Sequence, residues 1–467
     1  MLKLAVFSAN YRPTDQLDSY RGGLMRYLCA SGVQTLFLQA SDFIDDQTAL
    51  PRFSQAVSLI KTRLENFKPD GVLFINAAGR IPIIREFLEA KKIPSISWFV
   101  DHPGFFSPSL LLPGCQHTNV VANRNFVVWF KNRQSQDVDY VPFPCGFNEA
   151  PPSGATKRDL GSVFMGTMWD LIDIPYWIRC FEETRGRQVA LESFYPSLRS
   201  FFSSLNIGEN PHSESFADHQ AFFSAHFKSE PDFMTRISNY LSTIDRIKML
   251  SPLTGPDLSL YGPRPGWGMV IGAGHEGFLS SYRGHDIVNP LALFEICRRS
   301  KVGLNLFHVQ NQGGGLNFRF AEYVQAQTPI LSNRNQECEQ EFPHGEAAWY
   351  CDTPEEFRQA SLELLKDVKL GERLAKRATE ISHAKFNVQA ILSLIVAKLG
   401  LEFPINKTQV PTVLEIFTYK AGPIPGYGFR RFPRLVQWVK NGKYETQVRQ
   451  VLERLKILSP PLDKRGR

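Results

Sequence analysis

Short apolar runs alternate with amphipathic segments along the first third of the chain. The apolar runs have the composition of buried strands, and the segments between them repeat their apolar residues at helical spacing. This pattern predicts strands at 2–9, 33–39, 71–76 and 94–100, separated by helices at 23–30, 53–67 and 82–91. Strands and helices in alternation form a parallel sheet with helices on both faces. We therefore expect ligands at the carboxyl ends of these strands.

A second series of strands and helices follows a linker. Residues 149–159 combine proline, glycine and small polar residues, which is typical of a connection between domains. Beyond it, strands are predicted at 160–165, 258–261, 302–307 and 329–331, and residues 171–250 are predicted to be mainly helical. We expect three parts, a domain at 1–150, a second at 157–400 and an extension at 401–467.

One segment of the second domain carries the clearest candidate chemistry. From Lys301 to Leu331 a strand, a turn at Gly313–Gly315, a helix opening near Leu316 and Asn317, and another strand form a βαβ unit. Glycines let the backbone pass close to a ligand, and a helix N-terminus attracts an anion. The alternative is that these glycines form only a tight turn.

The helix after this turn carries a basic and an acidic side chain on one face. Arg319 and Glu322 are three residues apart, so a guanidinium and a carboxylate can act together. Phosphate suits the arginine and a ribose diol suits the glutamate. A solvated surface pair is the alternative. We add His308, which follows the strand, and Gly315 to the residues expected to bind the ligand.

Two strand ends of the first domain are further candidates. Gly22 and Gly23 stand at a predicted helix start after the first strand and suit a phosphate contact, although a glycine helix cap is equally consistent. Asp101 and His102 follow a strand that stops abruptly, where they suit the orientation or deprotonation of a hydroxyl. In the alternative, Asp101 caps the following turn and His102 faces water.

The remaining candidates surround the strands of the second domain. Arg264 follows a strand and suits a diphosphate oxygen, the alternative being an exposed loop arginine. The stretch Gly272–Gly277 matches the dinucleotide pattern G-x-G-x-x-G, but it lacks the preceding strand, the following helix and the downstream acidic residue that give the pattern its function. We reject a dinucleotide site there.

Several of these segments together resemble one family. The segment 301–331 is similar to the nucleotide-sugar signature of retaining GT-B glycosyltransferases, and more closely to the CgeB-like group, named for a spore-maturation protein. The residues that carry this resemblance are Leu304, Asn305, Asn317, Arg319 and Glu322. The commoner pattern has two glutamates, and the first falls at Gly314 here. Further segments resemble the family at Gly22–Gly23, Trp98–Pro103, Gly166 and Tyr282–Arg283–Gly284.

The resemblance implies the fold and the reaction. It implies a bacterial GT-B protein with two Rossmann-like parallel-sheet domains, and the tail from Leu401 onward, which we expect to be helical, lies outside the family pattern. The second domain would hold a nucleoside-diphosphate sugar, with Gly166, Tyr282 and Arg283 among its contacts, and the first domain would hold an acceptor hydroxyl. Positive charge from Arg319, Arg264 and helix N-termini would stabilise the departing diphosphate, so no metal and no cofactor is expected. Retention of configuration follows from the resemblance alone.

The rival function is a catalytically silent GT-B module that binds a nucleotide or glycan within an assembly.

Charge and composition limit the other classes of protein. The chain has 467 residues, 43% hydrophobic and 21% charged, which is ordinary for a soluble protein. Residues 420–467 hold twelve basic and three acidic residues, a balance of +9, which leaves −2 for the rest of the total of +7. A nearly neutral body argues against a nucleic-acid partner.

The ends and the cysteines bear on the compartment. Seven scattered cysteines fit neither a disulfide framework nor zinc. The N-terminal apolar run is too short for a signal peptide, and no run of about 18 apolar residues occurs. We expect a cytoplasmic protein. Residues 444–458 predict a basic helix with an apolar face, which would bind an anionic membrane or an acidic partner, or pack on its own domain.

Overall fold

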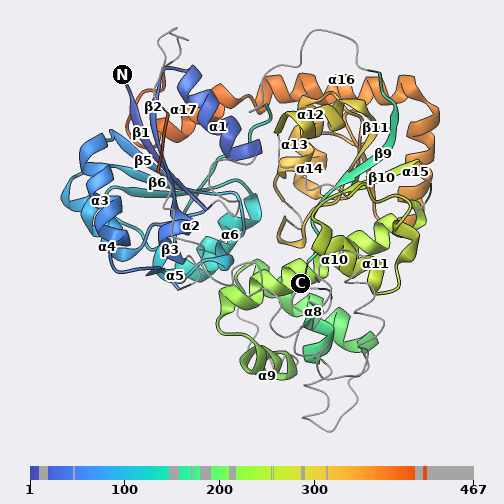
Figure 1. The fold of residues 1–467 in the computed structure, drawn as a ribbon, viewed down its shortest axis with the longest axis horizontal. Coiled ribbons are helices and arrows are strands. Elements are labelled where there is room, and N and C mark those ends of the chain that lie inside the picture. Colours follow the sequence, from blue (N-terminus) through green and yellow to red (C-terminus); the bar gives the residue numbers. More distant parts are fainter. Residues whose placement is uncertain are drawn as a thin grey trace, which may run out of the picture.

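The computed structural model describes residues 1–9, 19–45, 48–146, 157–169, 171, 173–178, 191–209, 217–253, 255, 257–284, 290–311, 314–404 and 414–417. Two parallel-sheet α/β domains lie side by side, and a set of helices lies below and between them in Figure 1. The expected linker at 149–159 and the expected helix at 444–458 lie outside the described residues, 157–159 excepted. No helix within these ranges is both long enough and apolar enough to cross a bilayer.

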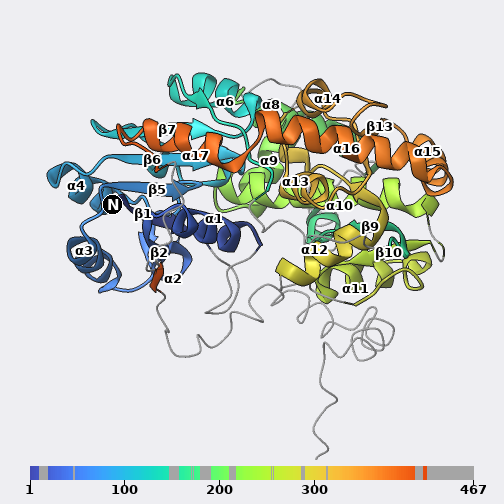
Figure 2. The same ribbon diagram turned by 90° about the horizontal axis from the view of Figure 1, so that it is seen from above.

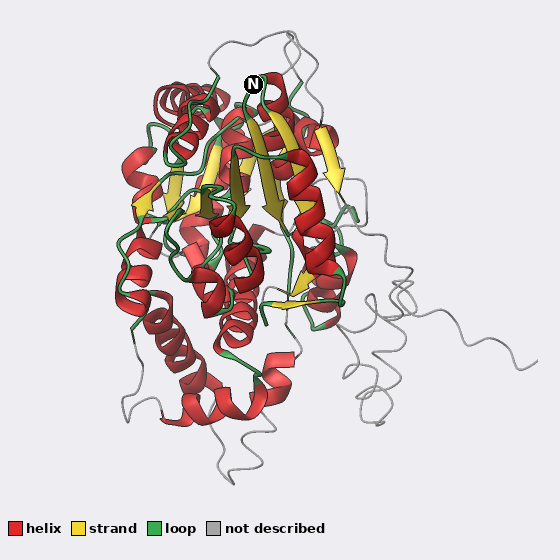
Figure 3. Ribbon diagram, turned by 90° about the vertical axis from the view of Figure 1, so that its left-hand side faces the viewer, coloured by secondary structure: helices red, strands yellow, loops and turns green. Residues whose placement is uncertain are grey.

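The N-terminal domain is built on a seven-stranded parallel sheet in the order β14-β2-β1-β5-β6-β7-β8. Its strands are β1 (Lys3–Ser8), β2 (Gln34–Gln39), β5 (Gly71–Ile75), β6 (Ser95–Phe99), β7 (His117–Val121), β8 (Asp139–Tyr140) and β14 (Leu414–Phe417). Its helices are α1 (Ser19–Ala30), α2 (Ala40–Phe43), α3 (Ala56–Phe67), α4 (Pro82–Ala90), α5 (Pro108–Leu111) and α6 (Arg124–Gln134). A short antiparallel pair, β3 (Ile44–Asp45) and β4 (Leu50–Pro51), lies beside it. Figure 3 shows this sheet with its helices.

Both faces of this sheet are buried, because successive residues of a strand point to opposite sides. Leu4 and Val6 of β1 belong to one apolar core, together with α1. Ala5 and Phe7 belong to another, together with α3, α4 and α6. The continuous apolar runs of the sequence predicted these strands within about two residues.

The C-terminal domain has a five-stranded parallel sheet in the order β10-β9-β11-β12-β13. Its strands are β9 (Leu160–Met165), β10 (Leu258–Tyr261), β11 (Ser300–Asn305), β12 (Ile330–Asn333) and β13 (Trp349–Cys351). Its helices are α11 (Arg264–Gly272), α12 (Pro290–Arg299), α13 (Phe318–Gln325), α14 (Gln336–Glu341), α15 (Pro354–Lys366) and α16 (Val368–Lys385). The 3-10 turns η3 (Ser251–Leu253), η4 (Glu276–Phe278) and η5 (Val309–Asn311) complete it. Thr353 caps α15 in a full capping box with Glu356.

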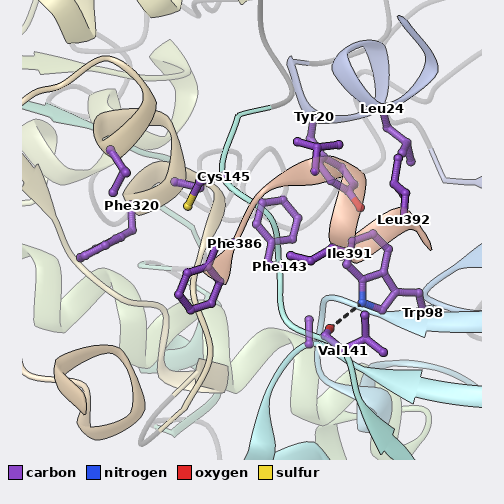
Figure 4. Close-up of a cluster of buried hydrophobic side chains, with 14 of the residues drawn as sticks. Tyr20, Leu24, Trp98, Val141, Phe143, Cys145, Phe320, Phe386, Ile391 and Leu392 are labelled. Atoms are coloured by element: carbon purple, nitrogen blue, oxygen red, sulfur yellow. Dashed lines mark hydrogen bonds between the residues drawn. The ribbon is translucent and has the colours of Figure 1, made fainter. Parts of the chain in front are cut away.

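The chain returns to the N-terminal domain after α16. There α17 (Val388–Ala397) packs with α1 in one core, so that α16 and α17 span both domains in Figure 2. Cys145 N donates to the carbonyl oxygen of Phe386 at 2.9 Å, which joins the end of the N-terminal domain to the returning segment. Figure 4 shows Phe143, Ile391 and Leu392 in the apolar cluster around this point. The expectation of two Rossmann-like domains with a returning helix is confirmed.

The described residues between 171 and 255 (171, 173–178, 191–209, 217–253 and 255) form a mainly helical insertion between the two domains. Its long helices are α8 (Leu191–Asn206), α9 (Ala217–His226) and α10 (Glu230–Leu250), which pack around an aromatic core that includes Phe201, Phe222 and Phe233. α10 contacts both the 3-10 turn η1 (Pro103–Phe105) of the N-terminal domain and η5 of the C-terminal domain. The insertion therefore holds the loops that follow β6 and β11 near each other.

Two local expectations require correction, and a third agrees with the structure. α1 begins at Ser19, four residues earlier than expected, so Gly22 and Gly23 lie inside the helix. Leu414–Phe417, expected to be part of a separate extension, is strand β14, which pairs in parallel with β2. The stretch Gly272–Gly277 follows helix α11 rather than a strand, which agrees with rejection of a dinucleotide site.

Candidate functional site

The turn between β11 and α13 lies where the sequence predicted a ligand site. Gly315 has φ +72°, a left-handed conformation that glycine adopts without strain. Asn317 caps α13, because its side-chain oxygen accepts the N–H of Phe320 at 2.8 Å. The residues that open the helix thus include a conventional polar cap, and the charged residues lie in the turns that follow.

Arg319 and Glu322 form an ion pair on α13, with 2.6 Å between Arg319 Nη1 and Glu322 Oε2. Their side chains are only 24% and 11% exposed, so they are not a solvated surface pair. Arg319 Nη1 also lies 3.8 Å from Met165 Sδ at the end of β9. Burial is the largest single effect and opposes the charge of Arg319, but Glu322, Cys297 and Tyr323 together outweigh it, so the pKa of the guanidinium is raised. Arg319 is therefore a charged group inside the domain, beside the end of its sheet.

The glycine-rich turn is packed against the other domain. Asn123, which caps α6 after β7, donates from Nδ2 to the carbonyl oxygen of Gly314 at 3.1 Å. Glu337 Oε2 accepts the N–H of Gly315 at 2.8 Å and the N–H of Arg124 at 3.2 Å. Because β7 and β11 both end here, the carboxyl ends of the two sheets meet at this contact.

Gly314 is the position of the first glutamate in the commoner family pattern. A Cβ atom there would lie 2.3 Å from Asn123 Oδ1 and 2.9 Å from Glu337 Oε2. Both distances are too short for a real contact. Any side chain at this position, a glutamate included, would therefore displace the Asn123 and Glu337 side chains from their present hydrogen bonds between the domains.

Asp101 occupies the expected position at the end of β6. Its carboxylate accepts Asn76 Nδ2 at 2.7 Å and Gln310 Nε2 at 3.1 Å. Gln310 belongs to η5 after β11, so this hydrogen bond joins the two domains. The Asp101 side chain is half-buried, at the carboxyl end of its strand. This is a place where a carboxylate can meet a hydroxyl held between the sheets.

His102 follows β6 as expected, but its side chain has other surroundings than expected. The imidazole is fully buried, and both ring nitrogens are used: Nε2–H donates to the carbonyl oxygen of Asn206 at 2.8 Å, and Nδ1 accepts the N–H of Gly104 at 3.0 Å. Burial lowers the pKa of His102 to about 4, although the hydrogen bond to Asn206 raises it. The neutral ring therefore joins the β6 loop to the end of α8, and it does not face water as the alternative reading held.

His308 is also a neutral buried imidazole. Its Nε2 lies 3.1 Å from Asn239 Oδ1, and its ring meets that of Trp169 edge-on at 5.5 Å. Burial, followed by the charge of Arg246, lowers the pKa of His308 well below the ordinary value. The ring lies at the end of β11 beside α10, near the other residues of the turn.

Two candidates, Gly166 and Arg264, follow strands β9 and β10. Gly166 directly follows β9, and its carbonyl oxygen accepts Trp267 Nε1 at 3.1 Å. Arg264 is exposed at the start of α11, with Nε donating to the carbonyl oxygen of Gly284 at 3.1 Å. Both lie at the carboxyl edge of the sheet, as expected.

Tyr282 and Arg283 extend the outer edge of the sheet instead. Tyr282 forms a parallel bridge with Leu260, and its hydroxyl donates to the carbonyl oxygen of Gly262 at 3.0 Å. Arg283 Nε donates to Ser259 Oγ, 3.3 Å away, within β10. Tyr282 also stacks on Trp267 of α11, and Arg283 Nη1 donates to the carbonyl oxygen of Ser280, so both residues lie beside the edge strand β10, two strands away from β11.

Gly22 and Gly23 are buried within α1. The same helix brings Tyr20 to Phe318, the first residue of α13, with ring centroids 4.5 Å apart. The start of α1 and the start of α13 therefore lie next to each other, as the resemblance implied for this glycine pair, although the helix and not a turn carries them.

Sequence analysis missed the residues that connect the parts of the site. Asn123 comes soon after β7, so a polar residue at a strand end was a usable signal for it, whereas Gln310 lies farther from β11, in the turn η5. Glu337 and Arg246 lie on helices and come to the site only through tertiary packing. No local pattern distinguishes them from surface charges.

The comparisons with known proteins concern the C-terminal half and the fold. The family model described as glycosyl transferase-like matches residues 243–397, a third of the chain, which includes the β11 turn and α13. No curated protein sequence is significantly similar to this chain.

Several solved structures are similar in fold at low identity. Sucrose-phosphate synthase from Thermosynechococcus elongatus has 11% identity and a TM-score of 0.46, over 86% of this chain and 98% of that one. HepE (Alr3699) of Anabaena, in complex with UDP and glucose, has 10% identity and a TM-score of 0.47, over 86% and 100%. T4 phage BGT with UDP-glucose has the same four values. At these scores the likeness carries nothing about the reaction of this chain. Its similarity to glycosyl transferases rests on residues 243–397.

Proposed function

We propose that this protein transfers a sugar from a nucleoside-diphosphate sugar to an acceptor hydroxyl. The observation that carries the proposal is the buried Arg319–Glu322 ion pair, which follows a left-handed glycine turn at the carboxyl end of a parallel sheet. This segment lies within the range that is similar to glycosyl transferases. A guanidinium and a carboxylate so close together match the phosphate and the ribose of a nucleotide.

The proposed roles follow the positions of the side chains. Glu322 accepts hydrogen bonds from the ribose hydroxyls. Arg319 and the N-terminus of α13 stabilise the diphosphate as it leaves, which is electrostatic catalysis of bond cleavage. On this basis the transfer needs no metal ion. Retention of the anomeric configuration is part of the proposal and rests on the resemblance at Asn317, Arg319 and Glu322.

Asp101 is the proposed contact for the acceptor. Its carboxylate is already oriented by Asn76 and Gln310, so it can accept a hydrogen bond from a hydroxyl without rearrangement. We assign His102 a positioning role in place of proton transfer, since both ring nitrogens bond the protein. The acceptor is a hydroxyl compound bound by the N-terminal domain.

A catalytically silent module that binds nucleotide or glycan is the second candidate. The absence of a glutamate at Gly314 favours it, because that residue of the commoner pattern has no room here. The two candidates share the donor site and differ only in turnover.

A two-stage experiment tests the proposal. Thermal unfolding of the full chain is first measured with UDP, GDP, ADP, CDP and dTDP, since a ligand that binds the native state raises the melting temperature. The sugar nucleotides of the base that binds are then tested for hydrolysis and transfer, with and without EDTA. Turnover that persists in EDTA supports the proposed enzyme. Binding without any turnover supports the silent module, and no binding to any nucleotide refutes the enzyme and the nucleotide-binding form of the module.

A further inference from the structure

A second arginine lies beside Arg319, and it comes from the helical insertion. Arg246 of α10 is 8% exposed, and its Nη1 donates to the carbonyl oxygen of Thr167 at 2.6 Å, just after β9. The guanidinium carbon lies 4.8 Å from the centre of the Trp169 ring and 5.8 Å from that of Phe164. The group is thus held at the carboxyl end of the same strand that Arg319 approaches through Met165.

The charge of Arg246 is not neutralised within the described part of the chain. No carboxylate there forms a hydrogen bond or ion pair with it. The adjacent Asp245 acts on it only through space, and that carboxylate is held by two nitrogens of Arg199 at 2.5 and 3.0 Å. Burial lowers the pKa of Arg246 to about 10, Asp245 raises it and Arg319 lowers it, so the guanidinium remains charged at neutral pH.

Buried charges in proteins are ordinarily paired, because removal of an ion from water is costly. Arg246 has a carbonyl and two aromatic rings in place of a counter-ion, and its Nε has no hydrogen-bond acceptor. The Nε of Arg319 is also buried without an acceptor. Both guanidinium groups therefore reach the end of β9, Arg246 at Thr167 and Arg319 at Met165, and each has a buried Nε without an acceptor, at the end of a parallel strand where an anion is expected.

We infer that Arg246 is a second phosphoryl-binding residue, which with Arg319 receives the diphosphate of the donor. Arginine suits this task because its N–H groups match phosphate oxygens in pairs. The inference rests on the proposed function for the identity of the ligand. It also gives the insertion a role: α10 supplies one of the two cations, so the donor site is complete only when the insertion is folded onto β9.

The experiment compares four proteins: the full chain and its variants Arg246→Met, Arg246→Lys and Arg236→Met. Met fills a similar volume without charge, and Lys retains the charge but loses the fork of N–H groups. Arg236 is a matched control on the same helix, 37% exposed and paired with Asp232 at 3.0 Å. Calorimetric titration measures the affinity for inorganic pyrophosphate and for the nucleoside diphosphates UDP, GDP, ADP, CDP and dTDP, and thermal unfolding is measured without ligand.

We expect Arg246→Met to weaken binding of the preferred nucleoside diphosphate by about 10- to 100-fold, the loss typical of a hydrogen bond to a charged group. Arg246→Lys should fall between that variant and the parent, and Arg236→Met should bind as the parent does. Without ligand, Arg246→Met should unfold at the same temperature as the parent or higher, because an uncompensated charge has been removed.

The outcomes separate this inference from the proposed function. Parental affinity in Arg246→Met overturns the inference and leaves the function intact, and lower unliganded stability with parental affinity shows a purely structural arginine. Pyrophosphate binding that depends on Arg246, with no binding of any nucleoside diphosphate, supports the anion site and refutes the donor. A parent protein that binds no diphosphate of either kind refutes both.

Discussion

Gln310 and Asp101 are joined across the two domains by a hydrogen bond of 3.1 Å from Gln310 Nε2 to Asp101 Oδ1. The other end of the same amide accepts the N–H of His102 at 3.0 Å. One side chain of the C-terminal domain therefore fixes both the carboxylate and the backbone at the end of β6. The proposed acceptor contact is positioned by the domain that holds the donor.

The first prediction concerns Asp101. We expect Asp101→Asn to lower turnover at least tenfold. The uncharged amide of the variant is a weaker partner than a carboxylate for the hydrogen bond and the proton of the sugar-accepting hydroxyl. Nucleotide affinity should remain parental, since Glu322 and Arg319 belong to the other domain. Steady-state kinetics and nucleotide titration measure the two effects. Asp139→Asn, which removes the exposed partner of Lys398, is the control. Parental turnover in Asp101→Asn would show that this carboxylate only links the domains.

The second prediction concerns Glu322. Glu322→Gln retains the shape and removes the charge, so nucleoside-diphosphate binding should weaken by about 1.5 to 3 kcal/mol. Calorimetry with the nucleotide selected by the thermal screen measures this loss. Glu380→Gln, which disrupts a half-exposed pair with Arg377 at the same i, i+3 spacing, should have no effect on affinity. If the parent and Glu322→Gln bind the nucleotide with equal affinity, Glu322 does not bind the ribose hydroxyls as proposed.

The third prediction concerns the packing of the domains at Gly314. Gly314→Ala places a methyl group 2.3 Å from Asn123 Oδ1, so the contact must open or distort, at a cost of about 1 to 3 kcal/mol of unfolding free energy. Urea denaturation measures the loss. Gly314→Ala in an Asn123→Ala background should cost much less, because the closest atom is gone. An equal cost in both backgrounds would mean that the methyl group meets a different obstacle.

The fourth prediction concerns the pH dependence of stability. The pKa of His102 is about 4 in the folded chain and near 6.5 when exposed, so between these values the unfolded chain binds the extra proton. The contribution of His102 to the free energy of unfolding is therefore complete above pH 6.5 and is lost as the pH falls towards 4. From pH 7.5 to 5.0 the loss should be about 2 kcal/mol.

His102→Gln should remove that share of the pH dependence, which urea denaturation of both proteins at the two pH values would detect. The buried His308 and His117 also have lowered pKa values and will contribute in both proteins, so the comparison depends on the difference between the slopes. Identical slopes would show that His102 is already solvated or charged in the native state.

The fifth prediction concerns the basic C-terminal segment. Residues 420–467 carry +9, and basic residues near an anionic surface contribute on the order of 1 kcal/mol each. Sedimentation with anionic vesicles at low salt should require this segment. A chain that ends after Phe417 keeps β14, and we expect it to bind nucleotide as the full chain does. Sedimentation of this shorter chain, or no sedimentation of the full chain, would contradict the proposed membrane contact.

The sequence predicted the parts of the fold that local patterns determine. Apolar runs such as Gly71–Ile75 and Leu160–Met165 can only be buried strands, and the spacing of Arg319 and Glu322 placed them on one face of a helix. The start of α1 was wrong because glycines at 22 and 23 suggested a boundary, while tertiary contacts of Tyr20 extend the helix past it. β14 was missed because four residues in a tail rich in proline carry too little pattern.

The chemistry that depends on long-range packing had no local signal. Glu337 meets Arg124 across 213 residues, and Arg246 meets Thr167 across 79. His102 was placed correctly at a strand end, but its burial depends on α8, more than 100 residues later. Such contacts require knowledge of how the helical insertion and the two sheets pack.

The strand order of the N-terminal sheet determines when this domain can complete its folding during synthesis. The N-terminal domain takes its edge strand from Leu414–Phe417 and part of its core from Ile391, Leu392 and Ile395. A ribosome completes residues 1–146 long before it reaches these segments, so the first domain to emerge leaves one flank of β2 unpaired and the apolar face of α1 uncovered. Until the last helix and strand arrive, that surface is a site for chaperones or for aggregation. The domain that begins the chain is the last one able to finish folding.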